Sequence, residues 1–541
     1  MSHLDDVNAA IGAGAFDRAA DLAARAVEAG ERHPILFNVL AFRDSEAGRF
    51  DSALGLLRRG LEIAPRDANL LYSTGFCLFR LGRDVEALGA LNTALDVRPG
   101  YAAALQHKGM IYERAGQDDA AERFYVEAQA SDPAYEDPYA GLASVAASRG
   151  DFARARELAA RALAIAPGQS TAHLALAKAD FDAGLFTAVV ERLTPLLADP
   201  RLHDADRPAF LALLGDALDA LKRPHEAFDA WSQGKTLSRD SYAGTALAET
   251  AQRQLDQLEA LEPFVSTLAP FPPPPPPPPA EPGPGRPREH IFLVGFPRSG
   301  TTLLEQVLAS HADVVSLEEK PLLEAAEMEF LASPEGLQRL LDAGDDLLDP
   351  FRELYWRLLA ERGLKVGGKV FIDKLPLASL LIPLIVRLFP DARILFAERD
   401  PRDVVLSCFR RGFKMNPGMY QFVTLEGAAR FYDRVMSLAD RYRRLTPGRI
   451  HAVRYEALVV DFEAQCREIC AFIGLEWTES LNDFAASARA RPIRTPSAAQ
   501  VRKGLYATGS GQWRRYEAQL APVLPVLAPW VQTLGYETGR P

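Results

Sequence analysis

Two glycines and three hydroxyl side chains gather in the segment GFPRSGTT, which spans residues 295–302. An apolar run at 291–294 precedes it, and apolar residues at a helical spacing follow it. We therefore expect a buried strand, a tight loop and a helix. Backbone N–H groups of such a loop and of the helix start bind phosphate-like anions. The candidate ligands are Arg298, Ser299, Gly300, Thr301 and Thr302.

The loop lacks the lysine of phosphate-transferring enzymes. Its Gly-x4-Gly spacing resembles the Walker A loop, but Thr301 follows Gly300 at the place of the lysine, and Arg298 lies inside the loop. In kinases and ATPases that lysine contacts the terminal phosphates of ATP. A P-loop kinase or NTPase is therefore an alternative that the missing lysine disfavours.

A second basic group is expected at the end of another strand. Residues 392–398 form an apolar segment, and RDPRDVVLSCFRR follows directly. Ser407 and Arg411 are four residues apart, so they share one face of a helix, and Arg399 lies at the end of the strand. Two guanidinium groups and a hydroxyl that converge suit a phosphate.

The sequence PRSGTT after a strand, with RDPRDVVLSCFRR following in order, resembles the sulfotransferase family, above all its protein-tyrosine and Golgi-type carbohydrate branches. The similarity spans about residues 289–520. It implies 3′-phosphoadenosine 5′-phosphosulfate (PAPS) as the donor, with its 3′-phosphate on Arg399, Ser407 and Arg411. The products would be adenosine 3′,5′-bisphosphate and a sulfate ester of a peptide tyrosine or a carbohydrate. This scheme needs no metal, because the protein supplies the cations.

The same resemblance implies the catalytic groups. Glu319 matches the glutamate that acts as the base, and Lys374 matches the lysine that stabilises charge on the bridging oxygen, together with Arg298. Pro321 stands where the tyrosine branch has an arginine, which leaves the acceptor open. His311 is a rival base, for which we favour a structural role.

The C-terminal part completes the resemblance. Tyr455 matches a tyrosine that supports the nucleotide. RTPSAAQVRKGLY is similar to the lid over the donor, and a basic lid would exclude water from a reactive anhydride. The candidate donor contacts in this segment are Ser497, Gln500, Arg502 and Lys503.

The N-terminal part of the chain repeats with a period of 34 residues. A glycine opens each period, an alanine follows the first five glycines after five residues, and prolines recur at the same period. This predicts paired helices with the glycine in the turn, and it resembles the tetratricopeptide repeat over about residues 1–200. Residues 205–240 read as an atypical capping pair with Lys222 in the glycine position. The glycines are Gly14, Gly48, Gly82, Gly116, Gly150 and Gly184.

A proline run at 272–279 marks the boundary between the two parts, since such a run forms an extended spacer. We expect a helical-repeat array at 1–240, a helix and linker at 241–288, and the catalytic domain at 289–541. The fold class is an all-α tetratricopeptide-repeat solenoid followed by a P-loop-like α/β domain with a mostly parallel sheet and helices on both faces.

Charge and hydropathy limit the partners. The formal net charge of −11 argues against a general nucleic-acid binder. No apolar stretch is long enough to span a bilayer and the N-terminus lacks a signal-peptide core, so we expect the cytosol. By resemblance the repeats bind a protein or peptide, or alternatively they only pack or self-associate. A repeat scaffold with an inactive catalytic half is a further alternative.

Overall fold

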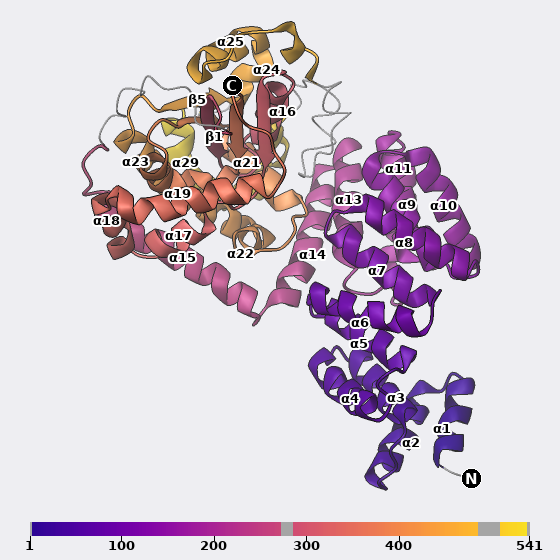
Figure 1. Cartoon of the computed structure of the whole chain (residues 1–541). Helices are drawn as coiled ribbons and strands as arrows, with labels where there is room; N and C mark the ends of the chain where they lie inside the picture. The colour runs from indigo at the N-terminus through magenta and orange to yellow at the C-terminus, as the bar shows by residue number, and fades with distance from the viewer. Residues whose placement is uncertain (1–2, 272–284, 485–508, 538–541) are drawn as a thin grey trace. The chain divides into compact units, whose positions relative to one another are not determined.

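The computed structural model describes residues 3–271, 285–484 and 509–537, and it divides into two compact units, 1–206 and 207–541. Figure 1 traces the chain from indigo to yellow. The expected boundaries at 240 and 288 stay a prediction, and the proline run and the four lid residues Ser497, Gln500, Arg502 and Lys503 lie outside the described residues.

The first unit consists of helix pairs in the predicted period. The glycine between the two helices of each pair has a φ of 69–81°, a left-handed conformation that glycine adopts without strain. The five alanines of the repeat have no exposed surface, because each lies where its helix meets a neighbour. The helices are α1 (His3–Gly12), α2 (Phe16–Glu28), α3 (Pro34–Glu46), α4 (Phe50–Ile63), α5 (Ala68–Arg80), α6 (Asp84–Val97), α7 (Ala102–Arg114), α8 (Asp118–Ser131), α9 (Asp137–Arg149), α10 (Phe152–Ile165), α11 (Ser170–Asp182) and α12 (Phe186–Ala198). The all-α solenoid is confirmed.

The second unit contains a five-stranded sheet in the order β2-β3-β1-β4-β5, and every pair of neighbouring strands is parallel. The predicted parallel sheet is therefore confirmed. Gly295 pairs with Ala397, and Lys374 pairs with Glu318, so the carboxyl ends of these strands lie at one edge. The strands are β1 (Glu289–Gly295), β2 (Val314–Glu318), β3 (Val370–Lys374), β4 (Arg393–Glu398) and β5 (Ile450–Arg454).

Helices cover both faces of this sheet. On one face, Ile291 and Leu293 pack against α16 and α25 in a continuous apolar core. On the other, Phe292 and Phe389 pack against Tyr355 of α19, since successive residues of a strand point to opposite faces. The helices of the second unit are α13 (Arg207–Ala220), α14 (Pro224–Tyr242), α15 (Ala246–Val265), α16 (Thr301–Ala309), α17 (Glu324–Phe330), α18 (Pro334–Asp342), α19 (Asp345–Ala360), α20 (Ile382–Leu388), α21 (Pro401–Arg410), α22 (Pro417–Tyr420), α23 (Leu425–Leu445), α24 (Tyr455–Val460), α25 (Phe462–Ile473), α28 (Glu517–Leu520) and α29 (Leu524–Thr533).

Candidate active site

The glycine loop joins β1 to α16 in a conformation that requires its glycines. Gly295 and Gly300 have φ values of 155° and 102°. A Cβ atom at Gly295 would lie 2.6 Å from the carbonyl oxygen of Ala397, and one at Gly300 would lie 2.9 Å from the Tyr455 ring. Arg298 also has a positive φ, 72°, which is uncommon for a residue with a side chain. The loop is therefore held tightly between the ends of β1 and β4.

The polar side chains of the loop are buried in an arrangement that suits an anion. The side chains of Ser299, Thr301 and Thr302 are nearly inaccessible, and no side chain caps the start of α16. Within the described part of the chain, Oγ of Ser299 is buried without a hydrogen-bond partner. A buried hydroxyl of this kind normally has a partner. A bound phosphate or sulfate group would fit this donor set.

Four of the predicted donor ligands meet beside the loop. Nε of Arg298 donates to Oγ of Ser407 at 3.0 Å, and Nη1 of Arg399 donates to the carbonyl of Arg298 at 2.9 Å. The guanidinium of Arg399 lies 4.9 Å from the centre of the Tyr455 ring. Burial, together with the nearby Arg411 and Arg399, lowers the pKa of Arg298 to about 9. The cluster therefore carries positive charge that an anion would stabilise.

Arg411 lies near this cluster and forms an ion pair with an acid, Asp216, that the sequence motifs did not include. Its Nη1 is 2.6 Å from Oδ2 of Asp216 on α13. Arg411 is nevertheless near enough to lower the pKa of Arg298. This predicted ligand thus lies near Arg298 of the cluster, and a carboxylate from a distant segment holds it.

Lys374 ends β3 with no exposed surface, and three carboxylates surround it. Its Nζ lies 2.8 Å from Glu319, 3.3 Å from Glu305 and 3.6 Å from Glu318. Burial by itself would lower the pKa of Lys374, but the three carboxylates raise it above its ordinary value. Lys374 therefore stays protonated at neutral pH.

Glu319 differs from the other two carboxylates in its access to solvent. Its side chain is 40% exposed, compared with 1% for Glu305 and 20% for Glu318. Its backbone has a positive φ of 47°, and its N–H donates to the carbonyl of Lys374 at 2.7 Å. The turn after β2 therefore presents the Glu319 carboxylate outward from the buried lysine.

A cavity of about 740 Å³ lies over the loop and Glu319. Glu319, Arg298, Thr301 and Thr302 line it. Many of its other lining residues belong to 412–419, a segment that follows α21 and carries no recognisable motif. Side chains there that sequence reasoning missed are Phe413, Lys414, Asn416 and Met419, with Leu377 from the segment after β3 and Gln254 from α15.

Sequence reasoning also missed Glu305. Burial raises its pKa to about 7, and Lys374 opposes this shift. The signal was present in the sequence, because a charged residue interrupts the apolar face of TTLLEQVLAS.

His311, the rival base, lies away from the cavity. It is not among the residues that line the space over the loop. Its Nδ1 accepts a hydrogen bond from the backbone N–H of Asp313 at 3.0 Å, and its side chain is buried at the end of α16. These contacts stabilise the turn into β2, which agrees with the structural role that we favoured.

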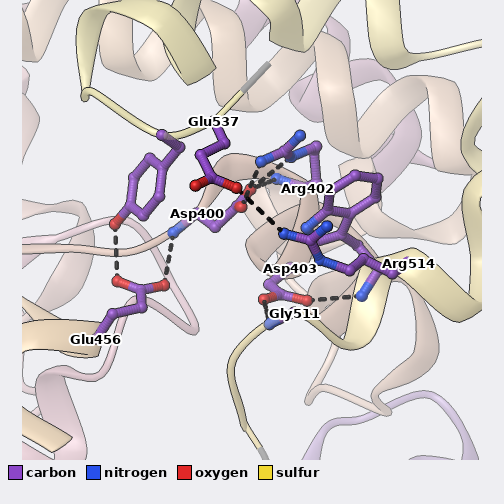
Figure 2. Close-up of polar contacts among 9 residues, drawn as sticks. Asp400, Arg402, Asp403, Glu456, Gly511, Arg514 and Glu537 are labelled. Carbon is purple, nitrogen blue, oxygen red and sulfur yellow. Dashed lines mark hydrogen bonds and ion pairs between the residues drawn. The ribbon is translucent and has the colours of Figure 1, made fainter. Parts of the chain in front are cut away.

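Acids at the start of α21 anchor the C-terminal segment (Figure 2). Asp403 accepts hydrogen bonds from the backbone N–H groups of Gly511 at 2.6 Å and Trp513 at 2.8 Å. Asp400 binds Arg402 through both carboxylate oxygens, and Arg402 lies 3.8 Å above the Trp513 ring. The acids of the RDPRD motif therefore hydrogen-bond to Arg402 and the backbone. Burial raises the pKa of Asp403, and the nearby Arg399 opposes this shift, so Asp403 also lies near one of the predicted phosphate ligands.

Across 3–271, 285–484 and 509–537, no group of three or more His, Cys, Asp and Glu side chains is placed to hold a metal ion. Across the same ranges, no helix has the length and apolar character needed to cross a membrane.

Both parts of the chain match known families. Residues 290–479 match the model of the sulfotransferase family, and residues 102–135 match that of the tetratricopeptide repeat. Over 255 residues the chain is 30% identical to an uncharacterized protein of Aquifex aeolicus, covering 45% of this chain and 33% of that one. It is 25% identical over 260 residues to the protein-tyrosine sulfotransferase of Drosophila melanogaster. This match covers 46% of this chain and 51% of the fly protein. The chain thus spans a third and about half of the length of these relatives.

Solved structures resemble each part. The sulfotransferase domain of the Synechococcus PCC 7002 olefin synthase is 21% identical with a TM-score of 0.34, covering 48% of this chain and 99% of that one. A tetratricopeptide repeat protein of Parabacteroides merdae is 16% identical with a TM-score of 0.35. The match covers 43% of this chain and 91% of that protein.

Proposed function

We propose that this chain, which joins tetratricopeptide repeats to a sulfotransferase-family domain, moves a sulfuryl group from PAPS to an acceptor hydroxyl. One observation carries the proposal. Arg298 of the glycine loop contacts Ser407 and Arg399, and Glu319, which pairs with Lys374, lines the same cavity as Arg298. The Arg298, Ser407 and Arg399 side chains suit the phosphates of the donor. Glu319 and Lys374 suit proton transfer and charge stabilisation beside the donor.

The donor would bind across the loop. Backbone N–H groups and the hydroxyls of Ser299, Thr301 and Thr302 would hold the 5′-phosphosulfate. Arg399, Ser407 and Arg411 would hold the 3′-phosphate, with Tyr455 beside the nucleotide. The lid contacts Ser497, Gln500, Arg502 and Lys503 stay a prediction from resemblance, since they lie outside the described residues.

Transfer would proceed in line. Glu319 takes the proton of the acceptor hydroxyl as that oxygen forms a bond to sulfur. The bond between sulfur and the bridging oxygen breaks, and Lys374 and Arg298 stabilise the charge that the departing phosphate gains. The products are a sulfate ester and adenosine 3′,5′-bisphosphate, with the proton on Glu319.

The acceptor would enter the cavity opposite the loop. A peptide tyrosine is supported by relatives from several animals that bear the name protein-tyrosine sulfotransferase. A carbohydrate hydroxyl is the other candidate, because Pro321 stands where the tyrosine branch has an arginine. The repeats would bind the protein substrate or a separate partner. The cytosolic location stays a prediction.

Calorimetry with the full chain tests the donor class. We expect micromolar binding of adenosine 3′,5′-bisphosphate and weak or no binding of ATP with Mg²⁺, because the 3′-phosphate separates this donor from a kinase substrate. A preference for ATP would overturn the proposal in favour of a kinase. Binding of neither ligand would favour a repeat scaffold.

A further inference from the structure

A helix hairpin in the second unit touches α21, the helix that carries Ser407. It consists of α13 and α14, and it precedes the sheet in the sequence (Figure 1). Asp216 and Asp219 are three residues apart on α13, so they share a face. On α14, the side chains of Phe228 and Lys235 lie two turns apart on the face that meets α21.

The hairpin holds one residue, Arg411, at two points. Oδ2 of Asp216 accepts from Nη1 of its guanidinium at 2.6 Å, and Nζ of Lys235 donates to its carbonyl at 2.7 Å. Beside these bonds, Phe228 stacks on Phe409 with ring centres 5.3 Å apart. Both the backbone and the side chain of Arg411 are therefore oriented by residues that lie 176 and 195 positions earlier in the chain.

Arg411 needs such support because like charges surround it. Arg411 and Arg399 both lower the pKa of the buried Arg298, after burial itself. Arg411 also lowers the pKa of the neighbouring Arg410. With no anion bound, these guanidinium groups repel one another. The Asp216 carboxylate offsets that repulsion for the outermost of them.

The bond to Asp216 leaves part of the Arg411 fork available. In the described ranges, Nε of Arg411 is buried and has no hydrogen-bond partner. A guanidinium carries five donors in a fixed plane, so one edge binds a carboxylate while another binds a phosphate. Asp216 engages Nη1 and thereby fixes the plane of the group without using all of its donors.

We propose that Asp216 and Lys235 are positioning residues for recognition of the 3′-phosphate. They hold Arg411 ready for a phosphate monoester next to Ser407, and they do not touch the donor themselves. This inference rests on the proposed function. It places part of the donor's specificity in a hairpin that the sequence assigns to the atypical last repeat.

The test compares two nucleotides that differ only in the 3′-phosphate. The full chain and its D216N variant are titrated with adenosine 3′,5′-bisphosphate and with adenosine 5′-monophosphate. We expect D216N to weaken bisphosphate binding about tenfold, because a charge-assisted support of Arg411 is lost, and to change monophosphate binding less than twofold. K235M should likewise lower the ratio of bisphosphate affinity to monophosphate affinity.

D219N is the matched control. It removes the same charge from the same helix, and Asp219 contacts Arg410, Arg515 and Tyr516 instead of Arg411. D219N should keep the ratio of the two affinities, and D216E should restore part of what D216N loses. Thermal unfolding of each variant identifies any that fail to fold.

Three outcomes overturn the inference. Tighter bisphosphate binding by D216N would mean that Asp216 competes with the phosphate. Equal weakening of both nucleotides would mean that Asp216 is purely structural, and no change in either affinity would mean that Arg411 does not need Asp216. In these cases the wild-type preference for the bisphosphate still supports the proposed function. A wild-type chain without that preference overturns the proposed function and this inference together.

Discussion

Exposure separates the three glutamates that surround Lys374. Glu305 is enclosed in the core, and burial raises its pKa to about 7. Glu318 is mostly covered, while Glu319 is 40% exposed and lines the cavity. An acceptor hydroxyl must reach the base directly. At the scale of single residues, Glu319 is therefore the carboxylate that we propose for proton transfer, while Glu305 and Glu318 offset the charge of Lys374.

Replacing Glu319 tests this assignment. We expect E319Q to lower sulfuryl transfer about 10²–10⁴-fold, the usual contribution of a general base, while bisphosphate affinity stays within about twofold. The measurement is transfer from labelled PAPS, paired with calorimetry. E318Q is the control, because it removes a neighbouring carboxylate that is farther from Lys374. Full activity in E319Q would rule out Glu319 as the base.

At the scale of elements, the turn between α13 and α14 departs from the other repeats. Lys222 stands in the glycine position and has a φ of 62°, within the left-handed region. The chain keeps the turn despite the side chain, and Ala227 remains fully buried as in the other repeats. The hairpin therefore carries backbone strain that glycine would relieve.

K222G should stabilise the second unit by about 0.5–1 kcal/mol, since the relief of the left-handed strain exceeds the added flexibility of the unfolded chain. Urea unfolding followed by tryptophan fluorescence measures this, because all five tryptophans lie after residue 206. G244A is the opposite control. Gly244 has a φ of 72° with open space around it, so alanine there should destabilise through strain alone. Destabilisation by K222G would contradict the strain argument.

At the scale of the whole molecule, burial of Lys235 links stability to pH. Burial lowers its pKa to about 8. The unfolded chain, with an ordinary lysine pKa of about 10.4, binds more protons than the folded chain between these values. The contribution of Lys235 to stability therefore rises as the pH rises from 8 to 10.4.

From pH 7.5 to 9.5, the wild-type unfolding free energy should rise by about 2 kcal/mol relative to that of K235M. Urea unfolding at both pH values measures this difference, and the other titrating groups cancel because both proteins share them. Parallel pH profiles for the two proteins would show that Lys235 titrates normally.

The sequence alone determined the features that depend on neighbouring residues. The 34-residue period predicted the helix pairs, because glycine turns and small contact residues act within one repeat. GFPRSGTT predicted the strand, loop and helix, and the positions of Arg298, Arg399, Ser407 and Tyr455 followed from strand ends that meet at one edge of a parallel sheet. The roles of these residues stay proposals.

Only the tertiary structure decided which distant residues meet. Asp216 and Arg411 are 195 positions apart. No sequence motif includes both of them. No sequence motif marks the cavity lining at 412–419. The cavity also includes Leu377 and Gln254, which come from other segments of the chain. The exposure that distinguishes Glu319 from Glu318 and Glu305 likewise depends on packing around Lys374. Charge balance and access are properties of the folded environment, so no local pattern of residues encodes them.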